Sequence, residues 1–268
     1  MHLISMTSLL PLLGLGAALG FFGGMFGIGG GIIAIPLLVL AFGMDQAVAQ
    51  GTALVMMAPN LLIAWWRYNQ RHPVALRTAL QIVVLASLTT WGVAHLATGL
   101  NPAVLRTVFS IFLLLLALRM LRHLRAARPT QDIDTGSRFN LRLMPLVGMV
   151  GGSSMGLLGI GGGLLATPLF TGWFGQRQTM AQSLSLALVA PSSLIALMTY
   201  SNARQVDWSI GLPLAIGGLF TVSAGVALAH RLPERRMRTA FACMLLCTAV
   251  WLLVRPLLLS FLGGTHQA

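Results

Sequence analysis

The stretch Gly27-Ile28-Gly29-Gly30-Gly31 returns 132 residues later as Gly159-Ile160-Gly161-Gly162-Gly163. A proline follows each copy at the same distance, at Pro36 and at Pro168. The match extends beyond the glycines, because 11 of the 23 positions from Gly20 to Phe42 are identical to the positions 132 residues further along. The chain is therefore a duplicated unit, and each copy places a run of glycines inside an apolar stretch.

The composition is that of a protein whose surroundings are lipid. Hydrophobic residues make up 56% of the chain and charged residues only 8%, whereas soluble domains carry about 25% charged residues. A helix needs about 20 apolar residues to cross the hydrocarbon of a bilayer. Six segments are predicted to do so: Ala47–Trp66, Thr78–Leu96, Val104–Leu121, Thr179–Tyr200, Ile210–Ala229 and Arg238–Val254. Two longer segments, Leu9–Phe42 and Leu143–Phe174, contain the glycine runs. The sequence thus predicts an all-α, polytopic integral membrane protein with about eight hydrophobic segments.

The charges are distributed as in a membrane protein rather than a nucleic-acid-binding protein. All 17 basic residues are arginine, and the net charge is +12. The arginines lie between the apolar runs, which favours roles in topology and in contacts with lipid headgroups over nucleic-acid binding. Cys243 and Cys247 do not have the spacing of a metal or redox site. No metal, no cofactor and no nucleic-acid partner is therefore expected.

The arginines also indicate a topology. The chain divides into a first repeat (residues 1–124), a basic linker (125–142) and a second repeat (143–268), and the positive-inside rule places the linker in the cytoplasm. If all eight segments crossed the membrane, 11 arginines would lie inside and 6 outside. If each glycine-broken segment enters and leaves on one side, the second repeat is inverted and the split becomes 14 to 3. The arginines therefore favour inverted repeats, with a V-shaped break in a crossing helix as the alternative.

The glycine runs are the candidate substrate site, comprising Gly29, Gly30, Gly31, Gly161, Gly162 and Gly163. Non-helical backbone at membrane depth is tolerated only where it is buried in protein or lines a wet cavity. A helix that restarts after such a run presents backbone N–H groups and partial positive charge, which suit an anion. Paired interruptions in two halves of a membrane protein also indicate a transport site. The alternative is that the glycines allow helices to pack closely, and this interpretation suits Gly20, Gly24 and Gly27.

Two glutamines occupy matching places after the glycine runs. Gln50 and Gln182 each lie 14 residues after a proline of the repeat, so they are predicted to donate hydrogen bonds to a bound anion from opposite sides of one cavity. The repeated prolines are predicted to act as hinges: Pro36, Pro59, Pro168 and Pro191. The serines of the second copy fit substrate contact and interhelical hydrogen bonding equally well. Tyr200 belongs to a group of aromatic residues at segment ends, which is typical of an interfacial belt.

The duplicated G-x-G-G-G-x-x-x-x-P pattern, the apolar segments and the basic connector resemble the TauE/SafE sulfite-exporter family. The resemblance covers Leu9 to Val254. It implies an inner-membrane permease for small organosulfur or organic anions, such as sulfite or sulfoacetate.

A transporter for a small anion, working by alternating access around the paired glycine-broken helices, is therefore the function expected. Its partners would be the anion and the lipid bilayer, and no catalytic residue is expected. A non-transporting membrane subunit or scaffold is one alternative. A membrane-embedded enzyme is another, although the sequence offers no paired acids and no activated nucleophile.

Overall fold

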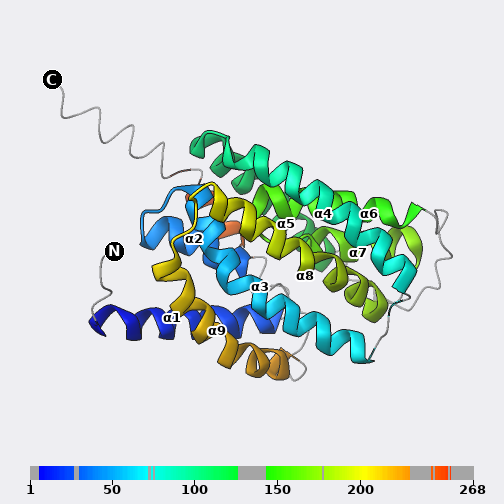
Figure 1. Ribbon diagram of the computed structural model, residues 1–268, viewed down its shortest axis with the longest axis horizontal. Coiled ribbons are helices and arrows are strands. Elements are labelled where there is room, and N and C mark those ends of the chain that lie inside the picture. The colour runs from blue at the N-terminus through cyan, green and yellow to red at the C-terminus, as the bar shows by residue number, and fades with distance from the viewer. Residues whose placement is uncertain are drawn as a thin grey trace. The chain divides into compact units, whose positions relative to one another are not determined.

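The computed structural model describes residues 6–26, 30–71, 74, 76–125, 143–176, 178–229, 243, 245–252 and 254. Within these ranges the regular structure is helical (Figure 1). The helices are α1 (Met6–Phe26), α2 (Gly31–Ala41), α3 (Gln46–Arg71), α4 (Leu76–Thr98), α5 (Pro102–Arg125), α6 (Pro145–Leu158), α7 (Gly163–Phe174), α8 (Gln178–Asn202) and α9 (Trp208–Ala229).

Five of the described helices are long and apolar enough to cross a membrane. Their candidate spans are Gln46–Trp66, Arg77–Thr98, Pro102–Arg119, Met180–Asn202 and Trp208–Gly225. They coincide with five of the six crossings predicted from the sequence, whose ends differ by a few residues. The sixth predicted crossing, Arg238–Val254, lies partly outside the described residues, because 238–242, 244 and 253 are not among them. The chain is accordingly a multi-pass helical membrane protein.

The chain forms two compact units that do not follow the order of the sequence. The first unit comprises residues 1–100 and 132–230 and contains α1–α4 and α6–α9. The second comprises residues 101–131 and 231–268 and contains α5. The first unit therefore draws four helices from each half of the duplicated sequence, and the glycine-rich stretches of both halves belong to it.

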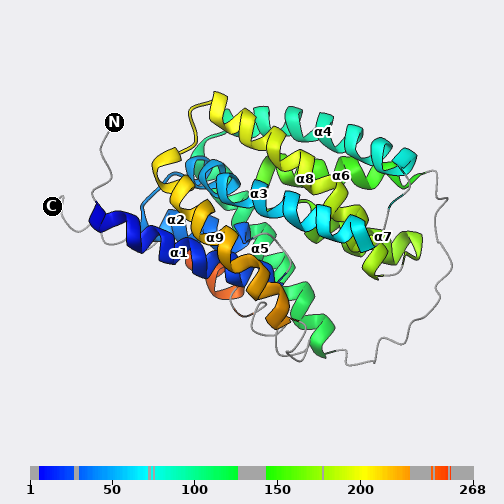
Figure 2. The same ribbon diagram turned by 60° about the horizontal axis from the view of Figure 1, so that its bottom comes forward.

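Helices α3 and α8 form the centre of the first unit. They pack against each other, and 72% and 61% of the residues in their candidate spans are buried, against 22% in α4 and 33% in α9. The two helices occupy the same place in their respective halves, yet they run in opposite directions (Figures 1 and 2).

The outer helices of the first unit pair across the two halves. Helix α1 packs against α9, and α6, the equivalent of α1, packs against α4, the equivalent of α9. A Cβ atom added to Gly20 would overlap the backbone of Gly218, and one added to Gly152 would overlap the backbone of Ala86. These two contacts are related by the 132-residue offset with the halves exchanged. Gly20 therefore allows close helix packing, which is the interpretation that the sequence favoured for it.

The outer faces of these helices are apolar, as a surface in contact with lipid requires. On α4, large hydrophobic side chains are exposed at intervals of three or four residues: Leu80, Val84, Leu88 and Trp91. On α9 the same spacing exposes Leu212, Ile216 and Phe220. The buried polar residues of the described chain are Gln, Asn, Ser and Thr, and no charged residue is among them. The interior is thus polar in places but uncharged.

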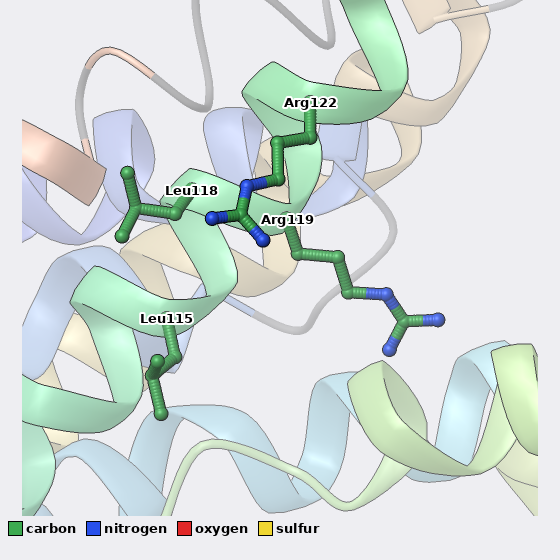
Figure 3. A pocket seen from close by; sticks show the side chains of 4 residues that line it. All are labelled: Leu115, Leu118, Arg119 and Arg122. Atoms are coloured by element: carbon green, nitrogen blue, oxygen red, sulfur yellow. The ribbon is translucent and has the colours of Figure 1, made fainter. Parts of the chain in front are cut away.

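In the second unit, the C-terminal part of α5 carries a basic and apolar face. A surface pocket there is lined by Leu115, Leu118, Arg119 and Arg122, and Figure 3 shows both guanidinium groups extending from the helix. These positions lie on one helix face because they are three, four and seven residues apart. Exposed leucines beside two arginines at a helix end are typical of the boundary between hydrocarbon and headgroups.

Candidate functional site

The two glycine-rich stretches each lie between a pair of helices. In the first half, α1 ends at Phe26 and α2 begins at Gly31, and residues 27–29 lie outside the described chain. In the second half, α6 ends at Leu158 and α7 begins at Gly163. The four residues between α6 and α7 include two glycines with positive φ, which is 65° at Gly159 and 89° at Gly161. Residues with a Cβ rarely adopt these angles, which explains why glycine stands there.

The stretches from the two halves meet inside the first unit. A Cβ added to Gly31 would lie 3.4 Å from the carbonyl oxygen of Gly159. The side chain of Met57, from α3, lies between the two stretches: its Sδ is the nearest atom to that added Cβ, and its Cε would lie 3.7 Å from a Cβ on Gly161. The fold thus brings the start of α2 next to the segment that precedes α7.

The structure explains in different ways why glycine occupies each position of the predicted site. Gly30 has a φ of 85°, so a side chain there would be strained. A Cβ on Gly31 would overlap the Met57 side chain, and one on Gly162 would overlap the backbone of Gly151. A Cβ on Gly163 would meet nothing closer than 3.7 Å. Packing therefore accounts for Gly31 and Gly162 and backbone conformation for Gly30 and Gly161, whereas neither requires glycine at position 163. Gly29 lies outside the described residues.

The helices that follow the breaks begin without a side-chain cap. At the start of α2 the carbonyl of Gly30 accepts the N–H of Ala34 at 2.9 Å, and at the start of α7 the carbonyl of Gly162 accepts that of Ala166 at 2.9 Å. The N-cap residues, Gly30 and Gly162, make no side-chain cap hydrogen bond. The N–H groups of Ile33 and Leu165 also bond to these two carbonyls, at 3.1 and 3.2 Å, whereas the N–H groups before them in each first turn have no partner within their helix. Both starts therefore offer donors and the positive end of a helix dipole.

Gln50 lies directly beside this meeting point. Its side chain is fully buried, and a Cβ added to Gly159 would lie 3.3 Å from the Cβ of Gln50. The Tyr200 hydroxyl donates a hydrogen bond to Oε1 of Gln50 at 2.8 Å, and it also lies 3.1 Å from the carbonyl oxygen of Gly156. The Nε2 of Gln50 has no hydrogen-bond partner among the described residues. Gln50 thus places a donor with no partner among the described residues in the protein interior, next to the second glycine-rich stretch.

Tyr200 is the site residue that sequence reasoning missed. Its assignment to an interfacial aromatic belt is wrong, because its side chain is fully buried and joins α8 to α3 and α6. A signal was present in the sequence: the only two tyrosines of the chain, Tyr68 and Tyr200, are separated by the 132-residue repeat offset. The side chain of Tyr68 lies outside the described part of the structure.

The remaining predicted residues lie on helices of the same unit. Gln182 is on α8 with a partly exposed side chain. Residue 27, which the repeat offset pairs with Gly159, lies outside the described residues, so a contact like that of Gln50 is not seen for Gln182. The four prolines lie inside helices that continue past them: Pro36 in α2, Pro59 in α3, Pro168 in α7 and Pro191 in α8. Their function as hinges stays a prediction.

The serines of α8 mostly bond within the protein. Ser192 donates to the carbonyl of Leu188 at 2.8 Å, and Ser193 donates to that of Ala190 at 2.7 Å. Ser185 shares a hydrogen bond of 2.9 Å with Thr167 of α7. These contacts favour a packing function for the three serines over substrate contact. Within the described residues, no three His, Cys, Asp or Glu side chains gather as a metal site would require.

Comparisons with known proteins agree with the helical membrane architecture. The model of the family "Sulfite exporter TauE/SafE" matches residues 12–252. A probable membrane transporter protein of Xylella fastidiosa is 25% identical over 257 residues, which cover 94% of this chain and 97% of that protein. Probable membrane transporter proteins of Methanocaldococcus jannaschii (26% identical, covering 88% of this chain and 92% of that protein) and Bacillus subtilis (25%, covering 87% and 90%) are also similar. No solved structure matches the chain.

Proposed function

The chain belongs to the sulfite exporter TauE/SafE family, and on this premise we propose that it carries a small anion, such as sulfite or a sulfonate, across the bacterial inner membrane. The similar proteins of Xylella fastidiosa and Methanocaldococcus jannaschii are named probable membrane transporters, and the similarity covers 97% and 92% of their lengths. This favours transport over catalysis or a purely structural function.

The arrangement of hydrogen-bond donors at this site is the observation that favours an anion as the substrate. Two uncapped helix starts, at Gly31 and Gly163, belong to the stretches that meet around Met57. Beside them lies the fully buried Gln50, whose Nε2 has no partner in the described protein. Backbone and amide N–H groups are hydrogen-bond donors, and the helix starts add partial positive charge, so together they suit an oxyanion without a buried cation. The uncharged interior supports an electrically neutral cradle of this kind.

The mechanism that we propose is alternating access between inverted repeats. The opposite directions of α3 and α8 (Figure 1) and the exchanged pairs α1–α9 and α6–α4 are the relations that two inverted halves would produce. In such proteins the substrate site lies where broken helices of the two halves meet. Rocking of one set of helices against the other would then open the site to each side in turn.

Flux into proteoliposomes tests this function. Purified protein would be reconstituted, and uptake of sulfite, sulfate, thiosulfate, sulfoacetate and short carboxylates would be compared with protein-free vesicles. Saturable uptake of at least one oxyanion is expected, and it should fall when Gly161 is replaced by alanine, because the φ of 89° at that position disfavours a side chain. Gly163→Ala is the matched control. Uptake of none of these anions by folded protein would contradict the proposal.

A further inference from the structure

Three buried amide side chains lie along one face of α3. Gln46, Gln50 and Asn60 are 2%, 0% and 3% exposed. Gln50 and Asn60 follow Gln46 by 4 and 14 residues. These separations are close to one and four turns at 3.6 residues per turn, so the three side chains share a face. Both polar atoms of Gln46, both of Asn60 and the Nε2 of Gln50 have no hydrogen-bond partner among the described residues. Buried polar groups are normally hydrogen-bonded, so this concentration on one helix face points to something polar that passes along it.

The equivalent face of α8 differs. Position 60 corresponds to Ser192, which bonds to the carbonyl of Leu188 in its own helix. Position 53 corresponds to Ser185, which bonds to Thr167. At position 60, α3 thus has an amide without a partner among the described residues, whereas α8 has a hydroxyl that is bonded within its own helix. The two halves are therefore chemically unequal at this position.

We propose that the transported anion moves along this face of α3, from Gln46 past Gln50 to Asn60, and that Met57 is the constriction on the route. The proposal rests on the proposed function and names the route for that same site. From Gln46 to Asn60 the helix rises about 21 Å, at 1.5 Å per residue, which is most of the thickness of the hydrocarbon. The amide N–H groups of Gln46, Gln50 and Asn60 would donate hydrogen bonds to the anion in turn as it moves.

Met57 occupies the position of a constriction. It lies on the same face between Gln50 and Asn60, its side chain is fully buried, and its thioether fills the space between Gly31 and Gly161. A thioether with three rotatable bonds can swing aside more readily than a branched side chain. The residue at the matching place in α8 is Val189, which contacts Gly161 and Gly163 of its own half. Met57 contacts both stretches.

Cysteine labelling tests the route. In a protein whose Cys243 and Cys247 are replaced by serine, Ala53→Cys places a thiol on the proposed face and Ala58→Cys places one on another face of the same helix. Both alanines are buried, at 0% and 1% exposure, so the substitutions are matched. An anionic, sulfonate-bearing thiosulfonate should modify position 53 at least tenfold faster than position 58, as measured by intact mass. A transported anion that is not itself a nucleophile should slow the reaction. Equal rates at the two positions, or faster reaction at 58, would overturn the route.

A size comparison tests the constriction. Met57→Ala should raise uptake of a longer alkylsulfonate, relative to the smallest transported anion, by at least threefold, whereas Val189→Ala should leave that ratio unchanged. An unchanged ratio in Met57→Ala, or the same rise in both variants, would remove Met57 from the route. Labelling is read without transport, so the route and the function fail separately. Labelling at position 53 with no flux in the wild type would contradict the transport function, and flux without this labelling contrast would contradict the route.

Discussion

Replacing Gln50 with leucine separates a substrate-binding function from a packing function. The substitution removes the Nε2 donor and the Oε1 acceptor while keeping a buried side chain of similar size. Tyr200 would lose one acceptor, but its hydroxyl still lies 3.1 Å from the carbonyl of Gly156. No buried hydroxyl is therefore left without an acceptor, and the protein should stay folded with a melting temperature close to that of the wild type.

The expected loss is one of affinity. A donor that reaches a bound anion in the interior contributes about 1–3 kcal/mol, and about 1.4 kcal/mol corresponds to a factor of ten in affinity. Half-saturation of uptake should therefore rise roughly tenfold or more in Gln50→Leu. Gln182→Leu is expected to have a similar effect if the two amides face one substrate. Gln50→Glu, which keeps the shape but replaces the donor with a negative charge, should bind the anion at least as weakly.

Tyr200→Phe distinguishes orientation of the amide from simple packing. The variant keeps the buried ring and removes only the hydroxyl that bonds Oε1 of Gln50. If this bond orients Nε2, affinity should fall in Tyr200→Phe, and the double variant with Gln50→Leu should be no weaker than Gln50→Leu alone. The assays are half-saturation in proteoliposomes and melting temperature in detergent on the same preparations. Wild-type half-saturation in Gln50→Leu, together with a lowered melting temperature, would refute the assignment.

Three further outcomes are expected. Gly163→Ala should retain flux, because a Cβ at position 163 meets no atom closer than 3.7 Å. Gly30→Val should lose flux, because the φ of Gly30 is 85°. Equal loss in both variants would show that steric fit does not determine flux at these positions. Gly152→Val should lower the melting temperature, since its side chain would overlap the backbone of Ala86, and a melting temperature equal to that of the wild type would contradict the packing seen between α4 and α6. Single cysteines at positions 71, 125 and 235 should all be protected from an impermeant reagent in intact cells, as the 14-to-3 arginine split predicts; labelling at 235 but not at 125 would exclude the inverted topology.

Local features of the sequence were sufficient to predict five of the membrane-spanning helices. Hydropathy depends on neighbouring residues, so five of the predicted crossings reappear as helices of nearly the same length. The duplication itself predicted matched places for Gln50 and Gln182, and the structure puts Gln50 against the glycine-rich stretch of the other half. Fold class was thus accessible from pattern alone.

Contacts between distant residues were not accessible in this way. The bond from Tyr200 to Gln50 joins residues 150 positions apart, and nothing in the local sequence distinguishes a buried tyrosine near a helix end from an interfacial one. The glycines were similarly ambiguous. The three glycines look equivalent in sequence, yet they differ in the structure. At position 162 a side chain would overlap the backbone of Gly151, and at position 161 the φ of 89° disfavours one. Neither reason applies at position 163. Only the tertiary arrangement assigns each glycine its reason.

The inequality of α3 and α8 bears on how a duplicated transporter binds one substrate. Two identical halves would present two equal sets of donors, and a single small anion would have to choose between them or lie on the axis that relates them. Here the amide of Asn60 in α3 has no partner among the described residues, whereas its counterpart in α8, Ser192, bonds within its own helix. Asn60 would therefore add a substrate contact on α3 that α8 does not match, while α8 contributes the hydroxyl of Tyr200 that bonds Gln50. Duplication would then supply the symmetry that alternating access needs, and divergence between the copies would supply a single route.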